Sequence, residues 1–375
     1  MSTTPLRQAA LAPAPLLLTP GPVMMTPDIL SLGGMQTPYF RNATFSGVHQ
    51  RCERQLLAAT NAPAGSRAVF ITGSGTAAME AAVLNFTRQA QPVLVVEGGA
   101  FGKRFVEIAT LHRRAVQVLP GNFIRNPVTA SGITATSHPA AALLINAHET
   151  TTGHLYDLTD SAGYCRSTDA LHIVDAISAF GADTIDMLSQ HIDVLILSSN
   201  KALGLQPGLS MLVMSPRAIQ RLPREPESFY FNVAAMLDDG LRGQTPFTPA
   251  VNTLLQLELR LGQWLQSGMA QLVQQTARTA SHFRKNIAGL PLKPLASSLS
   301  NAITALQVMP GISAKKLVDH LEQHHSIVVA ANGGELAETV FRVGHIGDIG
   351  PREMDQVVRA LIIELAAHLK RRSGD

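Results

Sequence analysis

The sequence predicts an α/β fold, with a mainly parallel sheet sandwiched by helices and a smaller α+β domain after it. Short apolar runs alternate with amphipathic stretches from residue 68 onward. The runs are apolar on both faces, as is typical of strands that helices cover on both sides. The stretches between them have helical periodicity, and glycine, proline and asparagine mark the joins.

Seven apolar runs are expected to form the strands of the larger domain. They are AVFIT (68–72), PVLVVEG (92–98), AVQVL (115–119), ALLINA (142–147), LHIVDAI (171–177), DVLILSS (193–199) and LSMLVMS (209–215). Helices are expected at 76–89 and 101–114, and a long helical pattern covers 250–285. Long helices of this kind often bridge domains.

The rest of the chain reads as strand, helix, strand and helix. These elements are expected at 301–309, 313–323, 339–345 and 351–372, and Pro351 stands at the start of the last helix. We therefore predict a large α/β domain over 16–255, a small α+β domain over 256–375 and an N-terminal arm over 1–15.

Composition narrows the classes of function. The 375 residues carry a net charge of +3, from 30 basic and 27 acidic side chains, and no long basic run, which argues against nucleic acid as a partner. Cys52 and Cys165 stand far apart and form no C-x-x-C motif, so a reducing, cytoplasmic setting is expected. The first 22 residues do not resemble a signal peptide, and no apolar run reaches the roughly 18 residues of a membrane span. A soluble protein with no membrane partner is expected.

The stretch ITGSGTAAMEA (71–81) follows the first strand and opens a helix. Such a turn directs backbone N–H groups and hydroxyls at whatever lies over the helix N-terminus, where an anion such as phosphate is favoured. Ala78 stands where the third glycine of a dinucleotide fingerprint belongs, so that type of site is not supported. An ordinary strand-to-helix turn is the alternative.

The stretch NAHETTTGH (146–154) contains the start of an H-E-x-x-H zinc motif, in His148 and Glu149. Thr152 occupies the position of the second histidine, so a zinc site is not expected. The threonines instead form a polar loop at the carboxyl end of a strand, where α/β folds place ligands. A solvated turn is the alternative.

Two charged residues end buried strands, Asp175 in LHIVDAI and Lys201 after DVLILSS. A buried carboxylate needs a cationic partner, for which an arginine is the structural alternative, or must be held neutral. Burial lowers the pKa of a lysine and makes its amine available as a nucleophile. A phosphate cradle, a carboxylate and a lysine amine at one edge of a sheet are the three groups that pyridoxal 5′-phosphate (PLP) requires.

Several motifs in order resemble the class V, fold type I aminotransferases, especially the group of 2-aminoethylphosphonate:pyruvate and alanine:glyoxylate aminotransferases. The resemblance runs from LLLTPGP (16–22) to FRVGHIGD (341–348). Between them lie GSGTAAMEA (73–81), GGAFGKRFVEIA (98–109), HETTTG (148–153), VDAISAFG (174–181), SSNKALGLQPG (198–208) and FTPAVNTLL (247–255).

This resemblance implies the roles of individual residues. Lys201 is expected to hold PLP through a Schiff base and, once freed by the substrate, to move the proton between Cα and C4′. Asp175 is expected to pair with the pyridinium nitrogen. The other residues implied at the cofactor are Ser74, Gly75, Thr76 and Asn200 at the phosphate, Phe101 stacked on the ring, and Thr151 and Ile177 lining it. Members of the family are homodimers with shared active sites, so Thr248 is expected to serve the partner's phosphate.

The resemblance also implies a substrate site that includes Gly21, Arg41 and Arg342. Arg342 matches the arginine that binds the substrate carboxylate, with a surface or interdomain salt bridge as the alternative. Segment 33–51 departs from the pattern of the aminoethylphosphonate enzymes, so Arg41 is either an added anion ligand or a surface charge.

The expected reaction is transfer of an amino group from 2-aminoethylphosphonate to pyruvate, which yields phosphonoacetaldehyde and alanine. The alternatives are an alanine, serine or phosphonoalanine transaminase that uses a 2-oxo acid and, more remotely, a non-catalytic PLP-binding protein. A lyase or desulfurase is disfavoured because neither cysteine lies in a recognisable catalytic loop.

Overall fold

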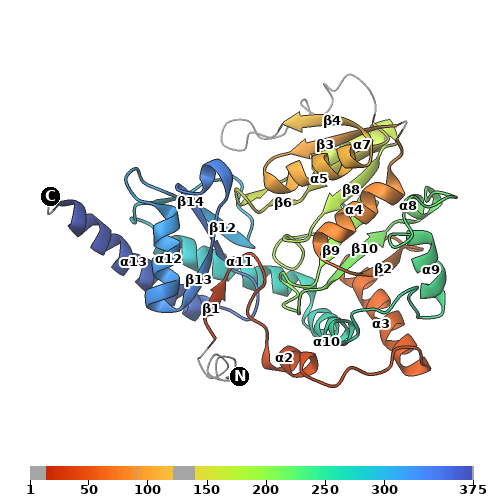
Figure 1. Ribbon diagram of the computed structural model, residues 1–375, viewed down its shortest axis with the longest axis horizontal. Coiled ribbons are helices and arrows are strands. Elements are labelled where there is room, and N and C mark those ends of the chain that lie inside the picture. Colours follow the sequence, from red (N-terminus) through yellow and green to blue (C-terminus); the bar gives the residue numbers. More distant parts are fainter. Residues whose placement is uncertain (1–13, 90, 121–139, 374–375) are drawn as a thin grey trace, which may run out of the picture.

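The computed structural model describes residues 14–89, 91–120 and 140–373, and it contains two principal sheets. The larger part of the molecule surrounds a seven-stranded sheet, and the smaller part, beside it in Figure 1, contains a five-stranded sheet. Among the described residues, no helix combines the length and the apolar character that crossing a membrane requires.

All seven expected strands of the larger domain lie in its sheet. Their spatial order is β2 (Arg67–Thr72), β10 (Leu209–Met214), β9 (Val194–Ser198), β8 (Leu171–Asp175), β5 (Ala142–Asn146), β3 (Pro92–Glu97) and β4 (Ala115–Pro120). Strands β9, β8, β5, β3 and β4 pair in parallel, whereas β10 is antiparallel to both of its neighbours. The predicted mainly parallel sheet is confirmed.

Helices cover both faces of this sheet because its strands are apolar on both faces. In β3, Leu94 and Val96 belong to the core on one face, while Val93 and Val95 belong to the core on the other. The first face is covered by α3 (Ala43–Ala59), α7 (Thr159–Thr168) and α10 (Val251–Ser267). The second is covered by α4 (Gly75–Phe86), α5 (Ala100–Leu111), α8 (Pro216–Gln220) and α9 (Val233–Leu241).

The smaller sheet has its own core around Phe283, Phe341 and Leu361. Its strand order is β1 (Leu16–Leu18), β13 (Ile327–Ala331), β14 (Val340–Gly344), β12 (Ile303–Val308) and β11 (Leu292–Pro294). The helices of this part are α11 (Met269–Asn286), α12 (Ala314–His325) and α13 (Pro351–Ser373). The short elements that remain are α2 (Pro27–Gly33), the hairpin of β6 (His148–Glu149) and β7 (His154–Leu155), and the 3-10 turn η1 (Gly334–Leu336).

The division of the chain between the two cores differs from the domain boundaries expected from the sequence. Strand β1 lies in the range expected for the larger domain, but it pairs in parallel with β13. The expected boundary after residue 255 falls inside α10, because Leu257 and Leu261 pack in the larger core. The long helical pattern is also two helices, which separate at Gly268, where φ is +88°. Apart from Leu18 of β1, the smaller core therefore begins only in α11, at Phe283.

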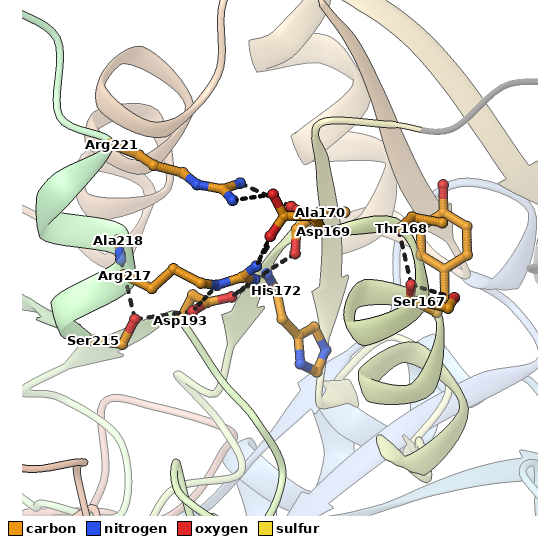
Figure 2. A network of polar contacts seen from close by, with 11 residues as sticks. Ser167, Thr168, Asp169, Ala170, His172, Asp193, Ser215, Arg217, Ala218 and Arg221 are labelled. Carbon is orange, nitrogen blue, oxygen red and sulfur yellow. Dashed lines mark hydrogen bonds and ion pairs between the residues drawn. The ribbon is translucent and has the colours of Figure 1, made fainter.

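A polar network fixes the edge of the larger sheet where β8 and β9 begin (Figure 2). Buried Asp193 accepts hydrogen bonds from the backbone N–H of His172 and from Ser215 Oγ, both at 2.9 Å, and from Arg217 Nε at 3.0 Å. Arg217 also reaches exposed Asp169, which pairs with Arg221 at 2.7 Å. The network holds one end of both strands, so their opposite ends, which carry Asp175 and Lys201, keep a fixed spacing.

Arg217→Ala is expected to lower the free energy of unfolding by about 2 kcal/mol, because Asp193 stays buried without its cation. The effect is smaller than for a fully buried ion pair, since about a third of the Arg217 side chain is exposed to water. Arg221→Ala is the matched control, because its ion pair is with exposed Asp169, and little change is expected. Urea denaturation of both variants tests this, and equal losses of stability would contradict it.

Candidate active site

A cavity of about 130 Å³ opens at the carboxyl ends of β8 and β9. It brings together Lys201, Asp175 and the turn that opens α4, which the sequence had predicted to meet at one edge of the sheet. Its lining residues are Ser74, Gly75, Thr76, Met79, Phe101, Arg104, His148, Thr150, Asp175, Ile177, Ser178, Ser198, Asn200 and Lys201.

Lys201 lies three residues beyond the end of β9, in a tight turn that its own carbonyl closes by accepting the N–H of Gly204 at 2.8 Å. Burial lowers the pKa of its ammonium group to about 8. Asp175 favours the charged form, whereas Arg342 and Arg104 oppose it. A substantial fraction of the amine is therefore neutral, and nucleophilic, near physiological pH.

Asp175 ends β8, and both of its carboxylate oxygens are engaged. Oδ2 accepts a hydrogen bond from Asn146 Nδ2 at 2.6 Å, and Oδ1 accepts the backbone N–H of Ile177 at 2.8 Å. Burial raises its pKa to about 6, while these two hydrogen bonds favour the ionised form. The hydrogen-bond partners of Asp175 are thus an amide and a backbone N–H. They are not the arginine that the sequence left open as a purely structural partner. Each oxygen keeps a lone pair for a cationic N–H in the cavity.

The turn before α4 has the features of an anion site. Ser74 is the N-cap of α4, and its hydroxyl makes no capping hydrogen bond within the described structure. A Cβ on Gly75 would lie 2.5 Å from Ile177 Cδ1, so only glycine leaves Ile177 where it lines the cavity. Arg104 donates to Thr76 Oγ1 at 3.1 Å and lies over the Phe101 ring, 4.8 Å from its centroid. A free hydroxyl, a helix N-terminus and a guanidinium converge here.

Glu149 holds the loop that contains HETTTG against α5. Its Oε2 accepts the backbone N–H groups of Phe101 and Gly102, both at 3.2 Å, and its Oε1 accepts that of Thr151 at 3.0 Å. The carboxylate thus satisfies free donors at the start of α5 and positions Phe101 at the cavity. From the sequence, Glu149 was considered only as part of a zinc motif. Its role as a hydrogen-bond acceptor could not be predicted, because it depends on where the hairpin after β5 places the carboxylate.

Thr150, rather than the predicted Thr151, lines the cavity. Thr150 Oγ1 donates to Ser178 Oγ at 2.9 Å. Thr151 Oγ1 faces α5 and accepts the backbone N–H of Ala100 at 3.2 Å. The sequence therefore predicted the polar loop at the strand end, but the threonine that faces the cavity is Thr150, one residue before the predicted Thr151.

His148 also lines the cavity and was not predicted to belong to the cofactor site. Its Nδ1 lies 2.9 Å from Ser178 Oγ, and its Nε2 is buried and has no hydrogen-bond partner among the described residues. Burial and the nearby Lys201 lower its pKa to about 3, so the ring is neutral at physiological pH. A buried nitrogen without a partner costs free energy, which indicates that a ligand with polar groups belongs in the cavity.

Gly21 and Arg342 approach the cavity from outside the large sheet. A Cβ on Gly21 would lie 2.5 Å from the carbonyl oxygen of Asn200 and 3.1 Å from Lys201 Nζ, so glycine is required beside the lysine. Arg342 lies on β14, where Nη2 donates to the carbonyl of Ala331 at 2.7 Å. Its Nε is buried and has no partner among the described residues, and burial lowers its pKa, which the nearby Glu149 opposes.

Arg41 and Thr248 do not line the cavity within one chain. Arg41 Nη1 donates to the carbonyl of Thr245 at 2.7 Å and to Gln244 Oε1 at 3.2 Å. It therefore secures the loop that leads to Thr248, and its exposure agrees with the expectation of a surface charge. Thr248 itself is exposed.

The residues around the cavity fit PLP. Ser74, Thr76 and Arg104 suit its phosphate, Asp175 suits a protonated ring nitrogen, and Phe101 offers an aromatic face. The polar ring substituents of PLP could also supply the partner that His148 Nε2 lacks.

Residues 38–361 match the model of the family described as aminotransferase class-V. The chain is 30% identical to an uncharacterized aminotransferase from Helicobacter pylori, with 93% of this chain and 94% of the relative covered. It is 26% identical to an alanine–glyoxylate aminotransferase from Oryctolagus cuniculus, with 95% and 94% covered. The solved structure of an alanine–glyoxylate aminotransferase from Nostoc sp. superposes with a TM-score of 0.89 at 25% identity, over 96% of this chain and 97% of that one.

The depressed pKa of Lys201 predicts how the apoenzyme takes up PLP. Only the neutral amine attacks an aldehyde, so the uptake rate is expected to rise with pH and to level off above about 8. Asp175→Asn should move the midpoint to lower pH, because it removes the anion that favours the ammonium. Arg342→Gln should move it to higher pH.

Stopped-flow absorbance of PLP binding as a function of pH measures these midpoints. Arg221→Ala is the control that changes a charge at the opposite edge of the sheet. A wild-type midpoint close to that of a free lysine, or equal midpoints in all variants, would refute the prediction.

Proposed function

The chain belongs to the class V aminotransferases, and from this premise we propose that it transfers the amino group of 2-aminoethylphosphonate to pyruvate. It is a PLP-dependent transaminase that uses an amino donor and a 2-oxo acid. The observation that carries the proposal is the half-buried Arg342, whose Nε is buried without a partner among the described residues and whose charge lowers the pKa of Lys201. The motifs HETTTG, SNK followed by PG, and FRVGHIGD favour this donor.

When bound, PLP supplies an electron sink that weakens the C–H bond beside the transferred nitrogen. Lys201 then acts as the general base and acid, because its Nζ has a pKa near the working pH and lies at the cavity. Asp175 holds the ring nitrogen in its protonated form, and Asn146 and the N–H of Ile177 keep that carboxylate oriented. The proton thus moves through the Nζ of one residue in both half-reactions.

Arg342 is proposed to bind the acid group of both substrates in turn. A guanidinium presents several N–H donors in a plane, which suits a carboxylate or a phosphonate equally. Its Nη2 donates to the carbonyl of Ala331, and its Nε has no partner among the described residues. A substrate acid would therefore compensate for burial of the guanidinium.

The second candidate is transamination of alanine, serine or phosphonoalanine with glyoxylate or pyruvate. The relatives favour it, because two carry alanine–glyoxylate aminotransferase as their name and one, from Paracoccus denitrificans, is named L-aspartate–glyoxylate aminotransferase. The guanidinium of Arg342 suits these carboxylate donors as well.

A homodimer with shared active sites is also proposed. Thr248 is exposed and lies outside the cavity of its own chain, on a loop that Arg41 secures. Beside it, Tyr230 stacks on Phe247, and Phe229 is 86% exposed, an apolar surface of the kind that interfaces cover. A cytoplasmic location is proposed because both cysteines, Cys52 and Cys165, are buried free thiols.

A donor panel tests the proposed reaction. We expect the highest kcat/KM for alanine formation from pyruvate with 2-aminoethylphosphonate, compared with serine, phosphonoalanine and aspartate. Lys201→Ala should abolish all turnover. Arg342→Lys should raise the KM for pyruvate by about tenfold or more and change kcat less, because the planar fork is lost.

The panel also includes alanine with glyoxylate, measured as glycine formed. If 2-aminoethylphosphonate gives no product while alanine supports glycine formation, the second candidate replaces the first. If no donor gives a product and bound PLP is unaffected, the protein is not a transaminase for these substrates.

Subunit mixing tests the shared site. Thr248→Glu places a negative charge where the partner's phosphate is proposed to bind, so this variant should lose most of its PLP affinity and activity. Mixing it with Lys201→Ala should restore about a quarter of wild-type activity, since half of the dimers are mixed and each has one intact site. No recovery, in a mixture whose subunits are shown to exchange, would contradict sharing through Thr248.

A further inference from the structure

Three histidines surround one buried carboxylate where α12 packs against α13, in the smaller part of the molecule. His320 Nδ1 lies 3.1 Å from Glu364 Oε2, and His324 Nδ1 lies 3.0 Å from Glu364 Oε1. His325 Nε2 is also 3.0 Å from Oε1. Glu364 is only 7% exposed, so these side chains enclose it almost completely. None of them lines the Lys201 cavity.

The positions of these groups match those of metal ligands. His320 and His324 are four residues apart on α12, so both rings lie on one face of the helix, with their centroids 5.1 Å apart. The ligand atoms of the two rings and of Glu364 all lie within 4.8 Å of one another. A tetrahedral ion with bonds of about 2.1 Å needs ligand atoms about 3.4 Å apart. His320 Nδ1 lies 3.1 Å from Oε2 and His324 Nδ1 lies 3.0 Å from Oε1, so each ring is near this spacing from one of the two carboxylate oxygens.

The surroundings also suit an ion. His325 remains available to hydrogen-bond to Oε1 of Glu364. Residues around a metal ion commonly make such hydrogen bonds to its carboxylate ligands. His324 is about half exposed, which provides a path of entry and space for water to complete the coordination. Two imidazoles and one carboxylate form a ligand set typical of Zn²⁺.

We propose that His320, His324 and Glu364 bind one divalent transition-metal ion, with Zn²⁺ as the preferred occupant. The ion fastens α12 to α13 and therefore stabilises the smaller part of the molecule, which carries Arg342. Beside these polar contacts, the two helices meet through apolar residues such as Leu317, Leu321 and Leu361. Occupancy of the site does not depend on which amino donor the enzyme uses.

Zinc binding to the holoenzyme, freed of metal with a chelator and then dialysed, tests the proposal. Titration with ZnCl₂ should show one saturable site per chain, and His320→Gln and His324→Gln should each weaken it by at least about tenfold. The matched control is His282→Gln, because His282 also pairs with a carboxylate on α13, Asp355, at 2.7 Å. This control should bind zinc like the wild type.

Two further measurements separate the outcomes. Saturating zinc should raise the thermal midpoint of the wild type and of His282→Gln, and it should not raise that of His324→Gln. Co²⁺ bound to the wild type should give the visible absorption of a site with imidazole ligands, which requires no variant to fold. Absence of a saturable site, equal zinc affinity in all three histidine variants, or colourless cobalt binding would overturn the proposal.

Discussion

The active site depends on burying an amine and a carboxylate at the same edge of one sheet. Burial is the largest cause that lowers the pKa of Lys201 to about 8 and raises that of Asp175 to about 6, while each charge favours the ionised form of the other. This arrangement requires β8 and β9 to remain adjacent and in register, as their parallel pairing ensures. The Asp193 network secures the opposite ends of the two strands and so supports their adjacency.

The hairpin of β6 and β7 connects this site to the rest of the molecule. On one side, Glu149 accepts N–H groups at the start of α5. On the other, Asn332 Nδ2 donates to the carbonyl of Thr151 at 2.8 Å, and the N–H of Ser300 donates to the carbonyl of Gly153 at 3.2 Å. The positions of His148 and Thr150 in the cavity therefore depend on contacts with both the large sheet and the smaller part.

The sequence was sufficient to predict the features that depend on apolar runs and their ends. All seven strands of the large sheet, Asp175, Lys201 and the turn at Ser74 could be recognised because strand ends meet at one edge. Features that depend on partners far away in the sequence could not be predicted. Strand β1 has only three residues, and its partner β13 lies near the other end of the chain. Likewise, the contacts of Arg41 with Gln244 and Thr245 follow no local pattern.

The pairing of β1 with the smaller sheet explains why a glycine lies beside Lys201. The chain leaves β1 and runs between the two parts, where a Cβ on Gly344 would lie 2.3 Å from the carbonyl oxygen of Thr19. Two residues after Thr19, a Cβ on Gly21 would lie 2.5 Å from the carbonyl oxygen of Asn200. One short segment thus touches β14, which carries Arg342, and the turn that carries Lys201. Because neither contact leaves space for a side chain, the segment fixes how closely Arg342 approaches Lys201.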